Sequence, residues 1–525
     1  MFFPTLVQDY LSISAEKYPD KEALICGQKR FTYSELDRKS DILAQTLKTL
    51  GVQRDDRVVV FLDNTAETVI SIYGILKANA VFVILNGGLK SKKLAFVLND
   101  CAPTVLITHT SKAKVCQEAF EYVDLKCRII WNGTGAQIPQ KLSPVSSDWE
   151  SLFSTSLYTD SKNFNVNSNN RECIDIDLAA LIYTSGSTGE PKGVMSNHHS
   201  MLSAARSIIQ YLENDENDII LNVLPLSFDY GLYQVLMAFM FGGTVVLEKS
   251  FLFLHKVLEQ ISKENVTGFP IVPTILAMLL NLQDLRNYYF GSLRYISNTG
   301  AALPVEHIRR LRDLFPNVNI YSMFGLTECK RVSYLPPNEI DDRPASVGKP
   351  MPNCEVFIVD ESGKKVNSGE IGELVVRGAN VMKGYWNAPE LSKQYFRPGP
   401  KPGETILYSG DYFRQDDDGY LYFIRRKDDM IKSKGERISA KELENTISAM
   451  DGVSEVAVVG MPDEIFGQAI KAVIVKNSSV DLTEKDVLKF CTQNLEPFAV
   501  PKYIEFLDAL PKTAHGKIDK KLLKN

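Results

Sequence analysis

The sequence predicts an α/β protein in which a large N-terminal domain, residues 1–427, precedes a small α+β domain, residues 428–525. Three patterns support this expectation. Apolar runs alternate with helix-like segments up to residue 247, short alternating runs separated by Gly and Asp follow within 355–424, and βα units resume after residue 427. Alternating strands and helices are typical of parallel sheets with helices on both faces, and short alternating runs are typical of a barrel-like β subdomain.

The N-terminal half contains apolar runs that we expect to form buried strands. They are residues 57–62, 80–85, 105–108, 129–131, 179–183, 219–224 and 244–247. A helix is expected over 65–78. The most apolar segment, 231–246, is shorter than the ~18 residues that a membrane span needs, so we expect a buried helix followed by a strand and no membrane span.

The C-terminal hundred residues repeat the alternation on a smaller scale. We expect helices over 440–449 and 484–495, and strands over 453–459, 470–475 and 503–506. About a hundred residues of such units can form a separate small domain.

The composition is typical of a folded, water-soluble protein. Hydrophobic residues make up 44% and charged residues 23% of the sequence, a balance that disfavours disorder. With 525 residues, the chain is too long to be one small binding module. The net charge of −5 does not provide the basic surface that nucleic acids require, so we expect no nucleic-acid partner.

The eight cysteines contain no C-x-x-C pair, which disfavours structural zinc and a disulfide framework. Reduced thiols in a cytoplasmic protein are the simpler interpretation. Near the N-terminus no basic segment precedes an apolar run, so we expect no signal peptide.

A loop rich in glycine and hydroxyl groups directly follows the apolar run at 177–183. Backbone N–H groups and hydroxyls in such a loop can surround phosphate oxygens, and the closing lysine adds a positive charge. The Walker spacing is not met, and an ordinary surface turn is the alternative. The candidate phosphate ligands are Thr184, Ser185, Gly186, Ser187, Thr188, Gly189 and Lys192.

Four further motifs follow in order: YSMFGLTE at 321–328, YSGD at 408–411, RKD with IKSKGERI at 426–438, and PKTAHGKI at 511–518. Together with the loop, they resemble the motifs of the adenylate-forming superfamily of acyl-CoA synthetases, peptide-synthetase adenylation domains and luciferases. The resemblance extends from about residue 11 to residue 521.

The resemblance implies a two-step reaction. A carboxylate first attacks the α-phosphate of ATP, which gives an acyl adenylate and pyrophosphate. A thiol then takes the acyl group. ATP and Mg²⁺ are the implied cofactors, and the small C-terminal domain is expected to be mobile between the two steps.

On the phosphate side, the resemblance implies that Lys192 and the loop hold the β- and γ-phosphates. Thr327 would donate a hydrogen bond to the α-phosphate. Glu328 would bind Mg²⁺, a cation that prefers oxygen ligands, although a solvated glutamate is the alternative.

On the adenosine side, small residues would let the adenine ring lie against the backbone. Asp411 would accept from the ribose hydroxyls and Arg426 would also reach the ribose; an ordinary turn aspartate is the alternative for Asp411. The adenosine set is completed by Gly300, Ala301, Ala302, Met323, Phe324 and Gly325.

In the C-terminal domain, the resemblance implies that Lys517 bridges the carboxylate and the α-phosphate as negative charge builds up. A solvated tail lysine is the alternative, since other lysines lie nearby. Asp428 would be the hinge, and Gly435 would approach the pantetheine arm. Two positions depart from the family pattern: Arg425 replaces a glycine and Lys520 replaces an arginine.

The block LPLSFDYG at 224–231 corresponds to the part of the family that shapes the acid pocket. Asp229 follows Phe228 where acyl-CoA synthetases typically have a histidine. A buried carboxylate is costly beside an apolar tail but is paired beside an ammonium, so the pattern favours an amino acid. A structural Asp229 is the alternative. Further expected pocket residues are Tyr230, Tyr233, Met323, Arg331 and Val332.

The predicted function is therefore activation of a small amino acid, such as proline or a β-amino acid, followed by transfer to the phosphopantetheine thiol of a carrier protein. A fatty-acyl or aryl acid ligase acting on CoA or a carrier protein is the alternative. A non-catalytic binding protein is disfavoured by the intact Lys192, Glu328, Asp411 and Lys517, and nothing favours a luciferase.

Overall fold

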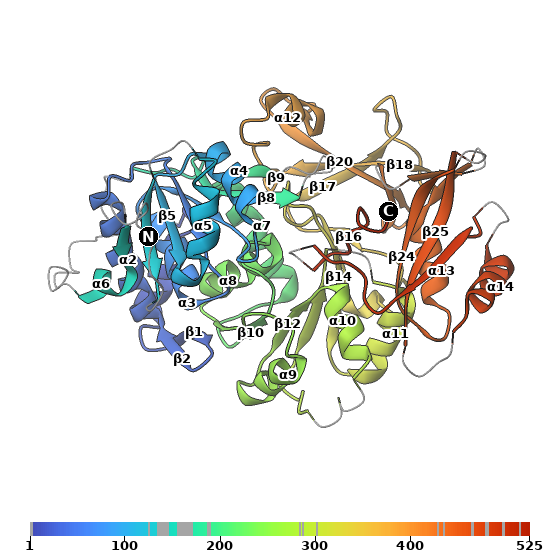
Figure 1. The fold of residues 1–525 in the computed structure, drawn as a ribbon, viewed down its shortest axis with the longest axis horizontal. Coiled ribbons are helices and arrows are strands. Elements are labelled where there is room, and N and C mark those ends of the chain that lie inside the picture. Colours follow the sequence, from blue (N-terminus) through green and yellow to red (C-terminus); the bar gives the residue numbers. More distant parts are fainter. Residues whose placement is uncertain are drawn as a thin grey trace. The chain divides into compact units, whose positions relative to one another are not determined.

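The computed structural model divides into two compact units, which we call unit one and unit two (Figure 1). Unit one comprises residues 1–270, 327–331 and 377–405, and unit two comprises residues 271–326, 332–376 and 406–525. The described residues are 4–123, 127–133, 146–154, 172–185, 191–282, 285, 288–300, 303–427, 430–433, 436–463, 467–477, 482–495, 499–513 and 516–524.

Unit one contains a seven-stranded sheet of order β7-β6-β5-β3-β4-β8-β9. All neighbours are parallel except the final pair, β8 and β9, which form an antiparallel hairpin. The strands are β3 (Arg57–Phe61), β4 (Val81–Ile84), β5 (Val105–His109), β6 (Arg128–Asn132), β7 (Ser146–Asp148), β8 (Leu178–Ser185) and β9 (Pro191–Asn197).

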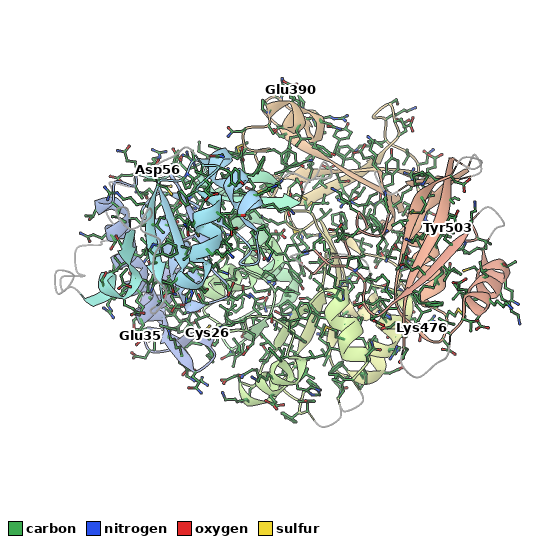
Figure 2. All side chains as sticks on the ribbon, viewed as in Figure 1. Cys26, Glu35, Asp56, Glu390, Lys476 and Tyr503 are labelled. Atoms are coloured by element: carbon green, nitrogen blue, oxygen red, sulfur yellow. The ribbon has the colours of Figure 1, made fainter. Side chains whose placement is uncertain are left out.

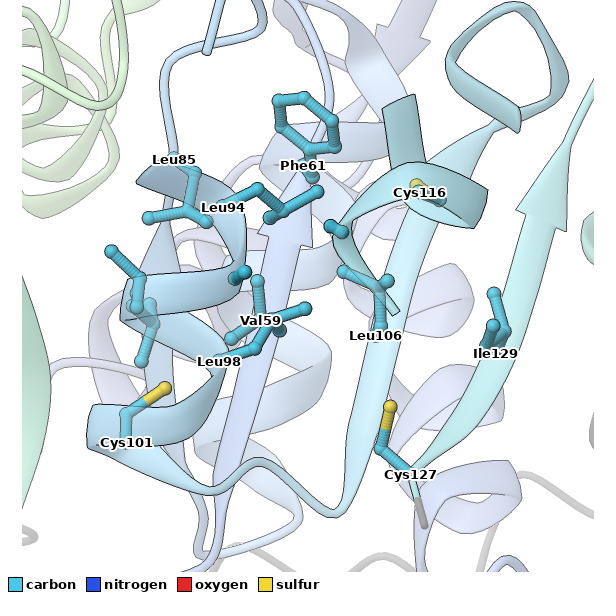
Figure 3. Packing of buried hydrophobic residues seen from close by; sticks show 14 of the residues in the cluster. Val59, Phe61, Leu85, Leu94, Leu98, Cys101, Leu106, Cys116, Cys127 and Ile129 are labelled. Carbon is cyan, nitrogen blue, oxygen red and sulfur yellow. The ribbon is translucent and has the colours of Figure 1, made fainter. Parts of the chain in front are cut away.

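Helices α4 (Ser91–Cys101) and α5 (Ala113–Ala119) cover one face of this sheet (Figure 3). Leu94 and Leu98 of α4 pack with Val59, Leu106 and other apolar side chains from the strands. Parallel strands covered in this way are fully apolar, which is why their sequences are continuous hydrophobic runs.

A second sheet of unit one has the order β12-β10-β11-β1-β2, in which only β1 and β2 are antiparallel. The strands are β1 (Glu22–Cys26), β2 (Lys29–Thr32), β10 (Ile219–Asn222), β11 (Thr244–Leu247) and β12 (Gly268–Ile271). Further helices of unit one are α1 (Asp9–Lys17), α2 (Tyr33–Thr49), α3 (Ala66–Lys77), α6 (Trp149–Ser154), α7 (His198–Leu212), α8 (Asp229–Phe241) and α9 (Leu254–Lys263).

The apolar segment predicted as a buried helix and a strand is confirmed as α8 followed by β11. Helix α8 ends at Gly242, which has a φ of 79° and whose added Cβ would lie 2.5 Å from the Tyr18 ring. Glycine is therefore required here by both the backbone and the packing. Charged side chains such as Glu35 and Glu390 lie on the exposed surface of the chain (Figure 2).

Unit two contains β13 (Tyr295–Asn298) parallel to β14 (Asn319–Phe324), followed by the antiparallel β15 (Ser333–Leu335) and β16 (Lys349–Pro350). Helices α10 (Pro273–Leu280) and α11 (Val305–Leu314) belong to the same unit. The predicted β-rich segment is confirmed by β17 (Cys354–Val359), β18 (Ile371–Gly378), β20 (Thr405–Gln415) and β21 (Leu421–Arg426). The sequence analysis did not predict the helix α12 (Pro389–Tyr395) and strand β19 (Phe396–Pro398), which lie between β18 and β20 in the chain and belong to unit one.

The C-terminal part is an α+β arrangement, as predicted. Its sheet has the order β23-β22-β25-β24, with β26 paired to β25. The elements are β22 (Met430–Ser433), β23 (Glu436–Ser439), α13 (Ala440–Ser448), β24 (Val453–Asp463), β25 (Gly467–Lys476), α14 (Glu484–Asn494) and β26 (Tyr503–Leu507). The α/β fold class is confirmed, and the domain boundary at 427/428 stays a prediction.

Candidate active site

The predicted phosphate loop lies at the tip of the β8–β9 hairpin in unit one. Thr184 on β8 is paired in register with Lys192 on β9, so the strand geometry places the lysine at the base of the loop. Residues 186–189 lie outside the described residues, as does the side chain of Ser185. The Lys192 Nζ lies 5.7 Å from the ring centroid of Tyr385 and 6.0 Å from that of Tyr395, both cation–π distances.

Glu328 accepts a hydrogen bond of 2.7 Å from the Tyr385 hydroxyl. Tyr385 therefore contacts both the lysine and the glutamate that the sequence predicts on the phosphate side, although no sequence pattern had identified it. Within the described parts of the chain, no cluster of three or more His, Cys, Asp or Glu side chains is suited to a metal ion. A single carboxylate still fits Mg²⁺, which is often held by one or two carboxylates together with phosphate oxygens and water.

Two buried asparagines hold the segment that leads into α8. The Asn64 amide donates to the carbonyls of Leu224 (2.8 Å) and Glu248 (3.1 Å), and its oxygen accepts from the Leu226 N–H (2.9 Å). The loop before α8 is thereby fixed to two neighbouring strand ends. The sequence analysis missed Asn64 because its partners lie about 160 residues away.

Asn222, at the end of β10, acts on the same segment from the other side. Its amide donates to the Gly231 carbonyl (3.0 Å) and its oxygen accepts from the Leu224 N–H (3.1 Å). Gly231 is required here because an added Cβ would lie 2.4 Å from the Pro225 carbonyl oxygen. These contacts fix the position of the first turn of α8.

Asp229 is the first residue of α8 and is only 9% exposed. A carboxylate is stabilised at this end of a helix by the unpaired backbone N–H groups. The rings of Phe228 and Tyr230 form an edge-to-face pair at 6.4 Å on either side of it. Burial raises the pKa of Tyr233 well above its usual value, Asp229 adds to that rise and Arg331 opposes it, so both charges act on this tyrosine.

Two cations, Lys330 and Arg331, are each only 4% exposed. The Lys330 Nζ lies 5.4 Å from the Tyr233 ring centroid, and the Arg331 Cζ lies 5.1 Å from that of Tyr230. Burial lowers the pKa of Lys330 to about 8, although Asp229 and Glu328 partly oppose the shift. The sequence predicted Arg331 in the acid pocket but missed Lys330, whose position directly before Arg331 was the available signal.

The backbone around Lys330 is strained. Lys330 has a φ of 62°, in the left-handed region, and the Arg331 N–H donates to the Cys329 carbonyl at 2.8 Å, which closes a three-residue turn. The Asn380 amide donates to the carbonyls of both Cys329 (3.0 Å) and Arg331 (2.9 Å). Such turns persist only where the surroundings enforce them, and Asn380 does so here.

In unit two, Asp411 and Arg426 form an ion pair of 2.8 Å between neighbouring strands. The Asp411 side chain is 3% exposed and that of Arg426 is 54% exposed. The Asp411 N–H also donates to the Ser409 hydroxyl (3.1 Å). The two predicted ribose ligands are therefore adjacent and face the same side of the sheet.

The other predicted adenosine residues lie at the ends of β13 and β14. Gly300 has a φ of 89°, and Met323 is buried. The Phe324 ring packs edge-to-face on Phe413 at 4.8 Å, so its ring stabilises the β subdomain. Val332 is buried in unit two, and Ala301 and Ala302 lie outside the described residues.

Lys517 is exposed in a tight turn near the C-terminus. The Thr513 N–H donates to the Lys517 carbonyl (2.6 Å), and Gly516 has a φ of 77° in the same turn. Lys512 and Lys520 are bound to Glu455 (3.0 Å) and Glu444 (2.6 Å), so these lysines have structural roles. Asp428 and Gly435 lie outside the described residues.

Comparison with known protein families identifies the AMP-binding enzyme model over residues 11–386 and its C-terminal domain model over residues 442–517. The chain belongs to the AMP-binding enzyme family. It is thus an AMP-forming adenylating ligase, which activates an acid with ATP and transfers the acyl group to a thiol. The thiol belongs to CoA or a carrier protein.

Two curated relatives represent two branches of the family. The chain is 31% identical to bacitracin synthase 1 of Bacillus licheniformis over 97% of its own length, but it spans only 9% of that protein. It is 30% identical to a long-chain-fatty-acid–CoA ligase of Bacillus subtilis, over 98% of the chain and 93% of the relative.

Solved structures agree on the fold. An anthranilate CoA ligase in complex with anthranoyl-AMP is 28% identical and matches 99% of this chain and 97% of its own, with a TM-score of 0.86. An ATP-bound MatB from Rhodopseudomonas palustris is 25% identical over 98% of each chain, with a TM-score of 0.83.

In the described part of this chain, no helix combines the length and apolarity that crossing a membrane requires.

Proposed function

We propose that this enzyme activates a small amino acid as its adenylate and transfers it to the phosphopantetheine thiol of a carrier protein in the cytoplasm. The observation that supports this proposal is Asp229, a buried carboxylate at the start of α8, flanked by Phe228 and Tyr230. A substrate ammonium beside Asp229 would pair with the carboxylate, whereas an apolar tail there would add no counter-charge of its own.

The roles on the phosphate side rest on the resemblance, and the contacts of Tyr385 within unit one support them. Lys192 would neutralise the β- and γ-phosphates, and Tyr385 would orient Glu328 for Mg²⁺ through its 2.7 Å hydrogen bond. When bound, Mg²⁺ supplies positive charge at the phosphate oxygens. Thr327, directly before Glu328, would donate to the α-phosphate.

The roles of unit two are separate. Asp411 and Arg426 would bind the ribose hydroxyls. The Arg426 Nε lies 2.8 Å from the Asp411 Oδ1 and would orient this carboxylate. Lys517 would stabilise the charge that develops between the attacking carboxylate and the α-phosphate. Asp428 would act as the hinge and Gly435 would approach the pantetheine arm in the second step.

A CoA ligase acting on a fatty or aryl acid is the second candidate, because one observation favours it. Lys330 is close enough to Asp229 for the carboxylate to act on the pKa of the lysine. The chain thus supplies a cation for Asp229 itself, and an ammonium on the substrate is not the only available counter-charge.

The deciding experiment compares kcat/KM for the best amino acid and for its deaminated analogue, in wild type and in Asp229→Ala, by ATP–pyrophosphate exchange. Loss of one partner of a buried ion pair costs about 3–5 kcal/mol, so the amino acid should lose two to four decades while the analogue loses much less. Equal losses for both would make Asp229 structural. A wild type that prefers fatty acids from C4 to C16 would establish the second candidate.

The acceptor is tested separately. Wild-type enzyme with its best acid is offered CoA or a phosphopantetheinylated carrier protein, and thioester formation is measured by mass spectrometry. Faster transfer to the carrier protein supports the proposal, and faster transfer to CoA contradicts it.

A further inference from the structure

We propose that the acid activated by this enzyme has a second carboxylate, which binds to Lys330 and Arg331. This inference rests on the proposed function, and together they make the substrate an acidic amino acid. Its ammonium binds Asp229, its side-chain carboxylate binds the two cations, and its other carboxylate reacts with ATP.

The first observation is that each of two buried cations has a nitrogen atom without a hydrogen-bond partner in the described part of the chain. Among the described residues, the Lys330 Nζ and the Arg331 Nε find no hydrogen-bond partner, although both side chains belong to residues that are only 4% exposed. Buried cations are normally paired, and leaving one unpaired costs several kcal/mol. A carboxylate suits both of them, because arginine and lysine bind it through strong charge-assisted hydrogen bonds.

The second observation is that both cations face the helix that bears Asp229. Lys330 lies over Tyr233 and Arg331 lies over Tyr230. These tyrosines are three residues apart on α8 and therefore lie on one face of the helix. The cations thus contact the same helical turn as Asp229. Asp229 and Glu328 both act on the charge of Lys330, but neither accepts a hydrogen bond from its Nζ, which leaves that atom available to a carboxylate of the substrate.

The third observation is that Lys330 is held in a strained backbone conformation. Its left-handed φ of 62° and the three-residue turn around it are unfavourable for a residue with a side chain. Asn380, itself fully buried, holds the carbonyls on both sides of the lysine. A strained backbone that positions an unpartnered charge points to ligand binding, since core packing alone would favour an apolar residue.

The test is a set of four acids with matched five-carbon chains. Glutamate has both the ammonium and the second carboxylate, norvaline has only the ammonium, glutarate has only the second carboxylate, and pentanoate has neither. Adenylation by the wild type is measured as kcat/KM in pyrophosphate exchange. We expect glutamate to exceed norvaline, and glutarate to exceed pentanoate, by about 10- to 100-fold, which corresponds to hydrogen bonds to charged groups.

The panel separates the two proposals. If glutarate equals glutamate, the ammonium site at Asp229 fails and the carboxylate site stands. If norvaline equals or exceeds glutamate and pentanoate equals or exceeds glutarate, the five-carbon set contradicts the carboxylate site, and the proposed function is still supported if norvaline exceeds pentanoate. The same comparison with the four-carbon set aspartate, 2-aminobutyrate, succinate and butyrate allows for a shorter substrate; the inference is overturned only if neither set shows the carboxylate preference.

Lys330→Met, with Lys330→Arg as its charge-conserving control, assigns the preference to the side chain. We expect the methionine variant to reduce the glutamate-to-norvaline ratio at least about tenfold and the arginine variant to retain most of it. This ratio is measured within one preparation, so partial misfolding does not affect it. A methionine variant that keeps the ratio but raises KM for ATP equally with all acids would assign Lys330 to the nucleotide and overturn the inference.

Discussion

Two of the buried charge groups of this enzyme, one around Asp411 and one around Lys330, differ in whether the chain completes them. In unit two, Asp411 has its partner Arg426 at 2.8 Å. In unit one, Lys330 and Arg331 lie over tyrosines of the helix that begins at Asp229, and neither Lys330 Nζ nor Arg331 Nε has a hydrogen-bond partner among the described residues. The first group is complete and suits a neutral ligand such as ribose. The second lacks a partner and suits a charged ligand.

This difference separates what the family shares from what distinguishes its members. Every member uses the same nucleotide, so a complete pair can serve all of them. The acid differs among members, and an unbalanced group of charges can select it, because a wrong acid leaves a buried charge without compensation.

Of the tests of this comparison, Lys517→Ala is expected to have the largest effect, and it tests whether Lys517 acts in the first step alone. Adenylation should fall by about 10²–10³, the usual loss when a fixed charge near the transition state is removed. Thioester formation from a supplied acyl adenylate should be nearly unchanged. The tail variant Lys524→Ala is the matched control and should behave as wild type. Equal losses in both steps would remove Lys517 from the proposed role.

The next prediction compares the two groups directly in protein without substrates. Asp411→Ala breaks a completed ion pair and should lower the free energy of unfolding by about 1–3 kcal/mol. Lys330→Met removes a buried charge without a hydrogen-bond partner and should leave stability unchanged or raise it. Urea denaturation of both variants measures the difference. If Lys330→Met were as destabilising as Asp411→Ala, the contrast between the two groups would be wrong.

A smaller change is expected on the phosphate side of unit one. Glu328→Gln and Tyr385→Phe should each raise the Mg²⁺ concentration for half-maximal adenylation by about tenfold or more, with the larger shift for Glu328. The Tyr385→Phe ring still faces Lys192, so only the hydroxyl that donates to Glu328 is lost. A Mg²⁺ requirement unchanged in both variants would exclude this carboxylate as a metal ligand.

The sequence was sufficient for the fold class because buried parallel strands such as β3 and β5 need continuous apolar runs. The resemblance of their motifs assigned both Asp411 and Arg426 to the ribose, and the structure pairs the two side chains on neighbouring strands. It could not identify Asn64, Tyr385 or Asn380. Their partners lie far away in the sequence, and a polar residue bound to a distant backbone group leaves no local pattern.

Lys330 was missed for a different reason. Its neighbour Arg331 was predicted as a pocket residue, but the left-handed backbone that buries Lys330 beside Asp229 is not encoded by any usual turn residue. Glycine or asparagine would have indicated such a turn. Lysine in that conformation is held by Asn380 instead, about 50 residues further along the chain.

The smallest predicted effect concerns the support that Asn380 gives to the turn at Lys330. Asn380→Ala removes two hydrogen bonds of 3.0 and 2.9 Å from the carbonyls beside Lys330, so the turn should relax toward ordinary backbone angles. Each bond contributes about 1 kcal/mol, so we expect KM for the preferred acid to rise several-fold while KM for ATP stays constant. Asn64→Ala is the matched control: it loosens the loop before α8 but leaves the turn intact, and should not reduce the preference for a second carboxylate. If Asn380→Ala and Asn64→Ala changed the preference for a second carboxylate equally, Asn380 would contribute only general rigidity and would not specifically position Lys330.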